Sequence, residues 1–132
     1  VCGTEPNLLI NATEISFDGL WELVRSYGGV MFPAHIDKTA NSLIANLGFI
    51  PPDSRFRTAE VKDLKKLHQL KREQPYLENC RIISNSDAHY LEYIHEPELT
   101  IQAEERSEAA VVEALARGLQ ERRRGEKVPG ND

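Results

Sequence analysis

The chain has 132 residues, 40% of them hydrophobic and 28% charged, with a net charge of −5, which suits one soluble globular domain with one core. This acidity argues against a nucleic-acid partner, and the sequence holds neither a membrane-spanning run nor a signal-peptide pattern, which excludes a membrane partner. Cys2 and Cys80 match no metal or redox spacing, so we expect free thiols and a cytoplasmic protein, although a disulfide stays open.

The first predicted elements are a helix and a strand joined by two glycines. Ser16 is a good N-cap, and apolar residues recur at helical spacing from there to Tyr27. The glycines at 28–29 end this helix, and the strand-like residues 30–32 follow and stop at Pro33. A helix that enters a strand in this way is half of an α/β repeat.

Helices and strands continue to alternate along the rest of the chain. We predict a short helix over residues 42–47, strands over 58–61, 81–83 and 98–102, a helix from 63 to the proline at 75, and a final helix after 107. This order predicts a mostly parallel sheet of roughly three to five strands with flanking helices. We expect residues 1–119 to form the domain and residues 120–132 to be a flexible polar tail.

Three candidate metal ligands follow two of the predicted strands. His35 comes just after the first strand, and Asp87 and His89 come just after residues 81–83. Because the carboxyl ends of parallel strands meet at one edge of a sheet, these side chains can converge there. A carboxylate and two imidazoles are a common ligand set for zinc, manganese or iron. A simpler interpretation is that Asp-x-His forms a turn with an exposed imidazole.

Four further residues could support such a site. Asp37 follows His35 at i+2 and could be a ligand, a base behind a ligand or a solvated loop residue, and we favour the last two. Glu60 could hydrogen-bond a ligand, although an exposed strand carboxylate is the commoner case. Ser86 could orient the ligands through a hydrogen bond, and His95 could be a ligand or proton shuttle, or simply a solvated loop residue.

Three stretches, in this order, carry a family resemblance: "GGVMFPAHID", "NLGFIPPD" and "IISNSDAHYLEYI". Together they resemble the second half of PHP-domain proteins, the polymerase and histidinol phosphatase superfamily, and in particular its bacterial metal-dependent phosphoesterases. The first twenty residues resemble the segment that leads into that half, so the resemblance covers residues 3–119.

The resemblance implies a distorted (β/α)7 barrel with divalent metals at its carboxyl-end face. Such a protein hydrolyses phosphoesters with metal-activated water, on a phosphorylated small molecule or nucleotide. By position, His35 matches the late histidine ligand of the family, and Asp87 and His89 match its terminal Asp-x-His ligands.

The chain departs from the family pattern in what it omits. The family's first His-x-His pair and several later ligands have no counterpart here, and Tyr93 and His95 stand where an acid and a glycine are usual. Because the chain starts at Val1 rather than Met, we expect the C-terminal piece of a longer enzyme, inactive alone. The alternative is a degenerate scaffold or assembly module without metal. An open sheet edge would also allow pairing with a second copy.

Overall fold

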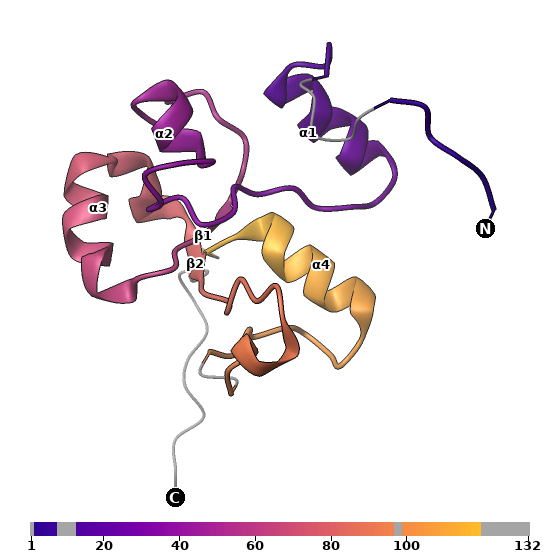
Figure 1. Cartoon of the computed structure of the whole chain (residues 1–132). Coiled ribbons are helices and arrows are strands. Elements are labelled where there is room, and N and C mark those ends of the chain that lie inside the picture. The colour runs from indigo at the N-terminus through magenta and orange to yellow at the C-terminus, as the bar shows by residue number, and fades with distance from the viewer. Residues whose placement is uncertain (1, 8–12, 97–98, 120–132) are drawn as a thin grey trace, which may run out of the picture.

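The computed structural model describes residues 2–7, 13–96 and 99–119, which form a mixed α/β structure (Figure 1). The elements in this part of the chain are α1 (Phe17–Ser26), α2 (Leu43–Leu47), β1 (Thr58–Glu60), the 3-10 turn η1 (Leu64–Lys66), α3 (Leu67–Glu73), η2 (Pro75–Asn79), β2 (Arg81–Ile83), η3 (Leu91–Tyr93) and α4 (Glu108–Arg117). The predicted tail at 120–132 lies outside the described residues. Of the described helices, none has the length and apolar character needed to cross a membrane.

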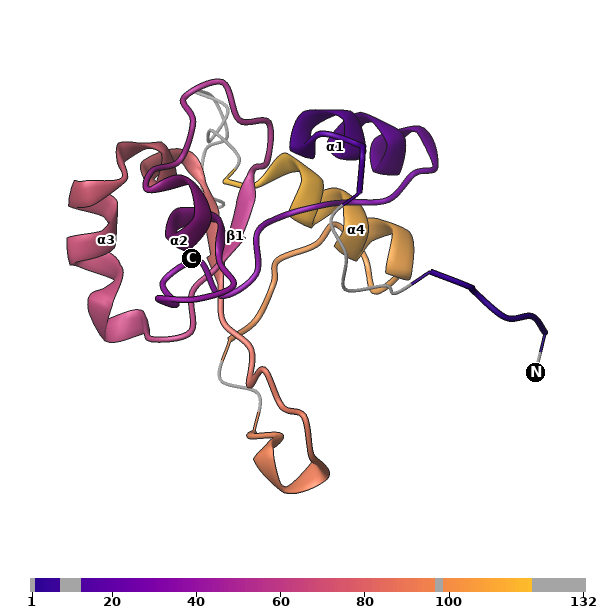
Figure 2. The ribbon, with the colours of Figure 1, turned by 45° about the horizontal axis from the view of Figure 1, so that its top comes forward.

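The two strands form a parallel pair at the centre of the fold. Thr58 pairs with Arg81 and Glu60 with Ile83, and the connection between the strands runs through η1, α3 and η2. Figures 1 and 2 show α2 and α3 on one side of this pair and α1 and α4 on the other. The expected α/β order is therefore present, with parallel strands joined through a helix.

Two strands are present among the described residues where we expected three to five. The segment before His35 is not a strand, although the Pro33 carbonyl accepts from the amide of Glu60 at 3.0 Å, and the amide of Ile36 donates to the Glu60 carbonyl at 2.8 Å. In a regular parallel ladder, the two residues that bond to the N–H and C=O of one residue are two apart in the sequence. The two partners of Glu60, Pro33 and Ile36, are three apart. The extra residue breaks the ladder. Residues 99–102 have no strand either, and Glu98 lies outside the described residues.

Serine caps begin three of the helices, and the caps at Ser16 and Ser107 are as predicted. Serine hydroxyls accept amide hydrogens from the first turns of three helices, in the pairs Ser16 with Gly19, Ser42 with Ala45, and Ser107 with Ala110. Gly28 and Gly48, just beyond α1 and α2, have φ of 74° and 80°, the left-handed conformation that glycine adopts at least cost. Local sequence therefore decides these boundaries.

A small core surrounds the strands. Its buried apolar side chains are Ile36, Ile50, Phe56, Ala59, Val61, Leu70, Leu77 and Cys80. The ring of Phe56 lies 4.9 Å from the ring of Tyr76 and meets the ring of Phe17 edge-on at 6.3 Å, centroid to centroid. Phe17 therefore ties α1 to the core.

The end of α4 is fastened to the amino-terminal end of the strands. The Thr58 hydroxyl donates to the carbonyl of Leu115 at 2.7 Å, and the Arg81 guanidinium donates to the carbonyl of Gly118 at 3.0 and 3.2 Å. The last carbonyls of a helix have no partner within it, so these donors satisfy groups that would otherwise need water. This contact leaves the opposite, carboxyl-terminal edge of the strands to the candidate ligands.

Candidate functional site

His35 and Asp87 lie beyond the carboxyl ends of β1 and β2, although the strand that we predicted before His35 is not formed. His35 sits in the turn that hydrogen-bonds to the end of β1, and Asp87 lies in the long loop after β2, which leaves the body of the fold (Figure 2). Both have positive φ, 32° for His35 and 52° for Asp87. Non-glycine residues seldom adopt this conformation, and it is found more often at functional sites than elsewhere.

Two lysines hold the Asp87 carboxylate. Lys38 Nζ donates to Asp87 Oδ2 at 2.7 Å, and Lys62 Nζ lies 3.6 Å from the same oxygen. The hydrogen bond from Lys38 holds the pKa of Asp87 below its usual value, and the charges of Lys38, Lys62 and His35 act in the same direction. Asp87 is therefore an anion at neutral pH with two cations against it.

The ring of His35 has an unsatisfied nitrogen. Its Nδ1 is buried and has no hydrogen-bond partner within the described residues, while the residue as a whole is partly buried. A buried polar atom without a partner is costly, and proteins rarely keep one without a reason. A ring nitrogen of this kind is also the atom with which histidine binds metals.

His89 is exposed and bonds within its own loop. Its Nδ1 lies 2.9 Å from the backbone oxygen of Asp87. Since a carbonyl can only accept, Nδ1 donates in this contact, and Nε2 is the ring nitrogen left for a ligand. His89 thus offers one nitrogen to a ligand, from the solvent side of the loop.

The predicted ligands fit only part of a metal site. The described residues contain no group of three or more His, Cys, Asp or Glu side chains placed to hold a metal ion. His35 and His89 each have an available nitrogen, whereas the Asp87 carboxylate is already neutralised by Lys38 and Lys62. The structure brings His35 and Asp87 together at one edge and leaves His89 exposed.

Asp37 joins two turns at the same edge. Its carboxylate oxygens accept the backbone amides of Lys62 at 2.8 Å and Asp63 at 2.9 Å. Partial burial raises the pKa of Asp37, but these amide hydrogen bonds and the charge of Lys66 lower it further, so the net shift is downward. Asp37 fixes the turn that carries His35 against the turn after β1.

The other three supporting candidates differ in environment. Glu60 is only 8% exposed, so our preference for an exposed strand carboxylate was wrong, and the pairing of its backbone on both sides explains its burial. Ser86 is partly buried and makes no side-chain hydrogen bond within the described residues. His95 is exposed, as expected of a solvated loop residue.

Lys38 and Lys62 are the residues at this edge that the sequence pattern did not single out. Each comes from a different turn, one after His35 and one after β1, and they meet at Asp87 only in the folded chain. A lysine in a polar turn is ordinary, and its spacing to a carboxylate far along the chain follows no local rule. The nearest available signal is that both follow the carboxyl end of a predicted strand.

No family model, curated protein or solved structure matches this chain. The candidate site therefore depends on the geometry of these residues alone.

Proposed function

We propose that this chain is the C-terminal part of a metal-dependent phosphoesterase of the PHP type, within a barrel to which β1 and β2 belong. His35, Asp87 and His89 would contribute to a metal site that ligands from elsewhere complete. The main support is the meeting of His35 and Asp87 beyond two parallel strands, with the Nδ1 atom of His35 buried and unsatisfied. A bound zinc, manganese or iron ion would supply activated water and neutralise charge on the phosphoryl group.

The lysines at this edge suit a phosphorylated substrate. Lys38 and Lys62 place two ammonium groups beside Asp87, where they can also attract phosphoryl oxygens of a small molecule or nucleotide. The three predicted ligands do not by themselves build a multi-metal site. We therefore expect the isolated chain to hydrolyse phosphoesters at or near the background rate.

Metal content tests this proposal. The purified chain is loaded with zinc, manganese or iron in turn, dialysed and measured by elemental mass spectrometry. We expect a stoichiometric signal that is lost in His89→Ala and retained in His68→Ala, which removes an exposed imidazole from α3. Lys38→Met should strengthen binding, because it frees the Asp87 carboxylate. Robust phosphatase activity of the chain with manganese would contradict the proposed inactivity.

The alternative is a non-catalytic module that binds no metal. The observation that favours it is the Lys38–Asp87–Lys62 cluster, because this cluster satisfies the carboxylate without a metal ion. It predicts no bound metal and a melting temperature that a chelator leaves unchanged. A short sheet with an open edge would let such a module pair with a second copy, which sedimentation at several concentrations would detect.

A further inference from the structure

A groove of about 600 Å³ lies at the opposite end of the strands from Asp87. It is bounded by α1, by the loop that leads into β1 and by the last turns of α4. The charged side chains that line it are Arg25, Arg55, Arg57, Arg117, Asp53 and Glu113. Four guanidinium groups thus face two carboxylates, in a chain whose net charge is −5. The groove is locally basic although the protein is acidic.

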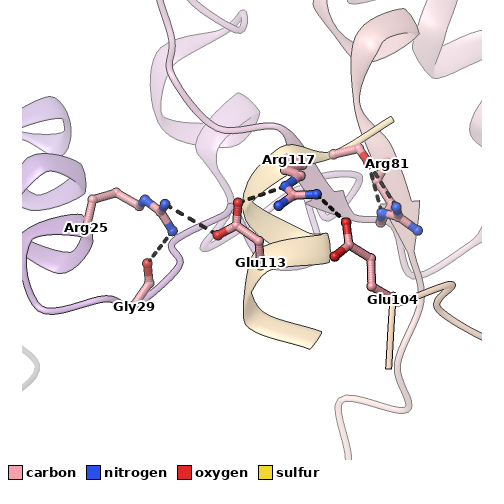
Figure 3. Close-up of polar contacts among 7 residues, drawn as sticks. Arg25, Gly29, Arg81, Glu104, Glu113 and Arg117 are labelled. Carbon is pink, nitrogen blue, oxygen red and sulfur yellow. Dashed lines mark hydrogen bonds and ion pairs between the residues drawn. The ribbon is translucent and has the colours of Figure 1, made fainter. Parts of the chain in front are cut away.

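Glu113 occupies the space between two of these arginines (Figure 3). Arg117 Nε donates to Glu113 Oε1 at 2.8 Å, and Arg25 Nη2 lies 3.8 Å from Glu113 Oε2. Arg25 also donates to the carbonyl of Gly29 at 3.0 Å, and Arg117 donates to Glu104 at 2.8 Å. One carboxylate of α4 therefore acts as the counter-anion for guanidinium groups from two different helices.

Arg57 differs from its neighbours in having no ion pair within the described part of the chain. It is exposed, and it directly precedes the first residue of β1. Arg55 pairs with Glu22 and lies over the ring of Trp21, 5.7 Å from the centroid. The groove therefore presents Arg57 without an ion pair. Arg25 and Arg117 share Glu113, and Arg117 also pairs with Glu104.

We propose that this groove binds a small phosphoryl anion of the diphosphate class, and that Glu113 competes with it for Arg25 and Arg117. The planar fork of arginine matches two phosphoryl oxygens, and several guanidinium groups together match an anion with more than one charge. The volume suits a small molecule. The overall acidity of the chain disfavours a long polyanion such as nucleic acid, so the ligand is small.

Trp21 provides the measurement, because it lines the groove and is the one tryptophan of the 132-residue chain. Pyrophosphate is titrated at constant ionic strength, with a chelator present to remove divalent metals, while tryptophan emission is followed. We expect a saturable change. Arg57→Gln should weaken binding by about tenfold, since it removes a charged donor. Arg72→Gln, an equal loss of charge on α3, should leave the affinity unchanged.

Glu113→Gln gives the sharper test. If Glu113 competes with the ligand, this variant should bind pyrophosphate more tightly, whereas Glu108→Gln on the same helix should match the unmodified chain. Circular dichroism establishes that each variant is folded. A Glu113→Gln variant that is folded and binds no more tightly would overturn the proposal. An absent saturable change, or equal effects of Arg57→Gln and Arg72→Gln, would do the same.

The same experiment distinguishes anion binding in the groove from anion binding at the edge near Asp87. His89→Ala alters the metal-site candidate and should leave pyrophosphate binding intact. Loss of binding in that variant would assign the anion to the edge near Asp87 and overturn the assignment to the groove. A failed metal test leaves the arginine groove unaffected, because it depends on none of the proposed ligands.

Discussion

Lys38 and Asp87 are 49 residues apart in the chain, and their side chains meet with Nζ 2.7 Å from Oδ2. The pair joins the turn that carries His35 to the loop that carries His89. Because these two segments lie beyond different strands, the contact sets how the two halves of the candidate site face each other. The same contact is also the largest cause of the lowered pKa of Asp87.

Replacing Lys38 should return the pKa of Asp87 toward its usual value. In Lys38→Met we expect the pKa of Asp87 to rise toward its usual value of 3.8, because the hydrogen bond and the closest charge are removed together. Lys62→Met should raise it less, since Lys62 Nζ is 3.6 Å away. Carboxyl carbon chemical shifts followed by NMR across the acid range give both values. A larger effect from Lys62 than from Lys38 would contradict this geometry.

Asp37 should make the fold sensitive to acid. Its pKa is lowered in the folded state, so its contribution to stability is present above the usual value of 3.8 and is lost as the pH falls through the lower, folded value. We expect the urea midpoint to drop in that range, and Asp37→Asn to flatten the drop. Glu92→Gln is the control, because Glu92 is exposed and makes no hydrogen bond within the described residues. An unchanged acid profile in Asp37→Asn would count against the two amide contacts.

The helices could be predicted from local signals and the full sheet could not. Ser16 and Ser107 start helices through their own hydroxyls, so a few neighbouring residues contain the information. The stretch before Pro33 has a strand pattern, but it does not form a regular strand beside β1. One extra residue between its two hydrogen bonds to Glu60 interrupts the ladder, and this interruption cannot be predicted from the pattern. Strand pairing is a long-range property, which periodicity alone does not fix.

In the candidate site, too, some features could be predicted from the sequence and others could not. Asp87 could be placed at this edge because it follows a predicted strand that is present, β2, a rule that needs only element order. His35 reaches the same edge without the strand predicted before it, because the turn that carries it hydrogen-bonds to Glu60. The lysines that hold Asp87, and the arginine groove at the other end, depend on side chains from distant segments. Sequence spacing does not predict such long-range contacts, so the lysine partners of the Asp87 carboxylate could be identified only from the structure.

The two cysteines should differ sharply in reactivity. Cys2 is exposed, while Cys80 is 1% exposed and its burial raises the pKa of the thiol to about 11. Only the thiolate reacts with iodoacetamide, so the folded chain near pH 8 should gain one label, at Cys2. Denaturant should expose Cys80 and add the second. Peptide mass spectrometry locates the labels, and equally fast labelling of Cys80 in the folded chain would show that it is not enclosed in this core.

Among the glycines that the structure describes, Gly118 should tolerate a side chain least well. It has φ of 69°, and a Cβ atom there would lie 2.2 Å from the carbonyl oxygen of Arg57. Gly118→Ala must therefore move the end of α4 away from β1 and weaken the hydrogen bonds from Arg81, at a cost of about 3 kcal/mol in the free energy of unfolding.

Gly28→Ala is the matched control, because Gly28 has a similar φ of 74° but nothing within 4 Å of the added atom. Backbone strain alone should cost about 1 kcal/mol there. Urea unfolding of both variants measures how much the contact with Arg57, together with the ψ of −136° at Gly118, adds to the cost of a positive φ. Equal losses of stability would mean that α4 does not pack closely against Arg57. A much larger loss in Gly118→Ala would establish that the last turn of α4 is anchored to the amino-terminal end of the sheet.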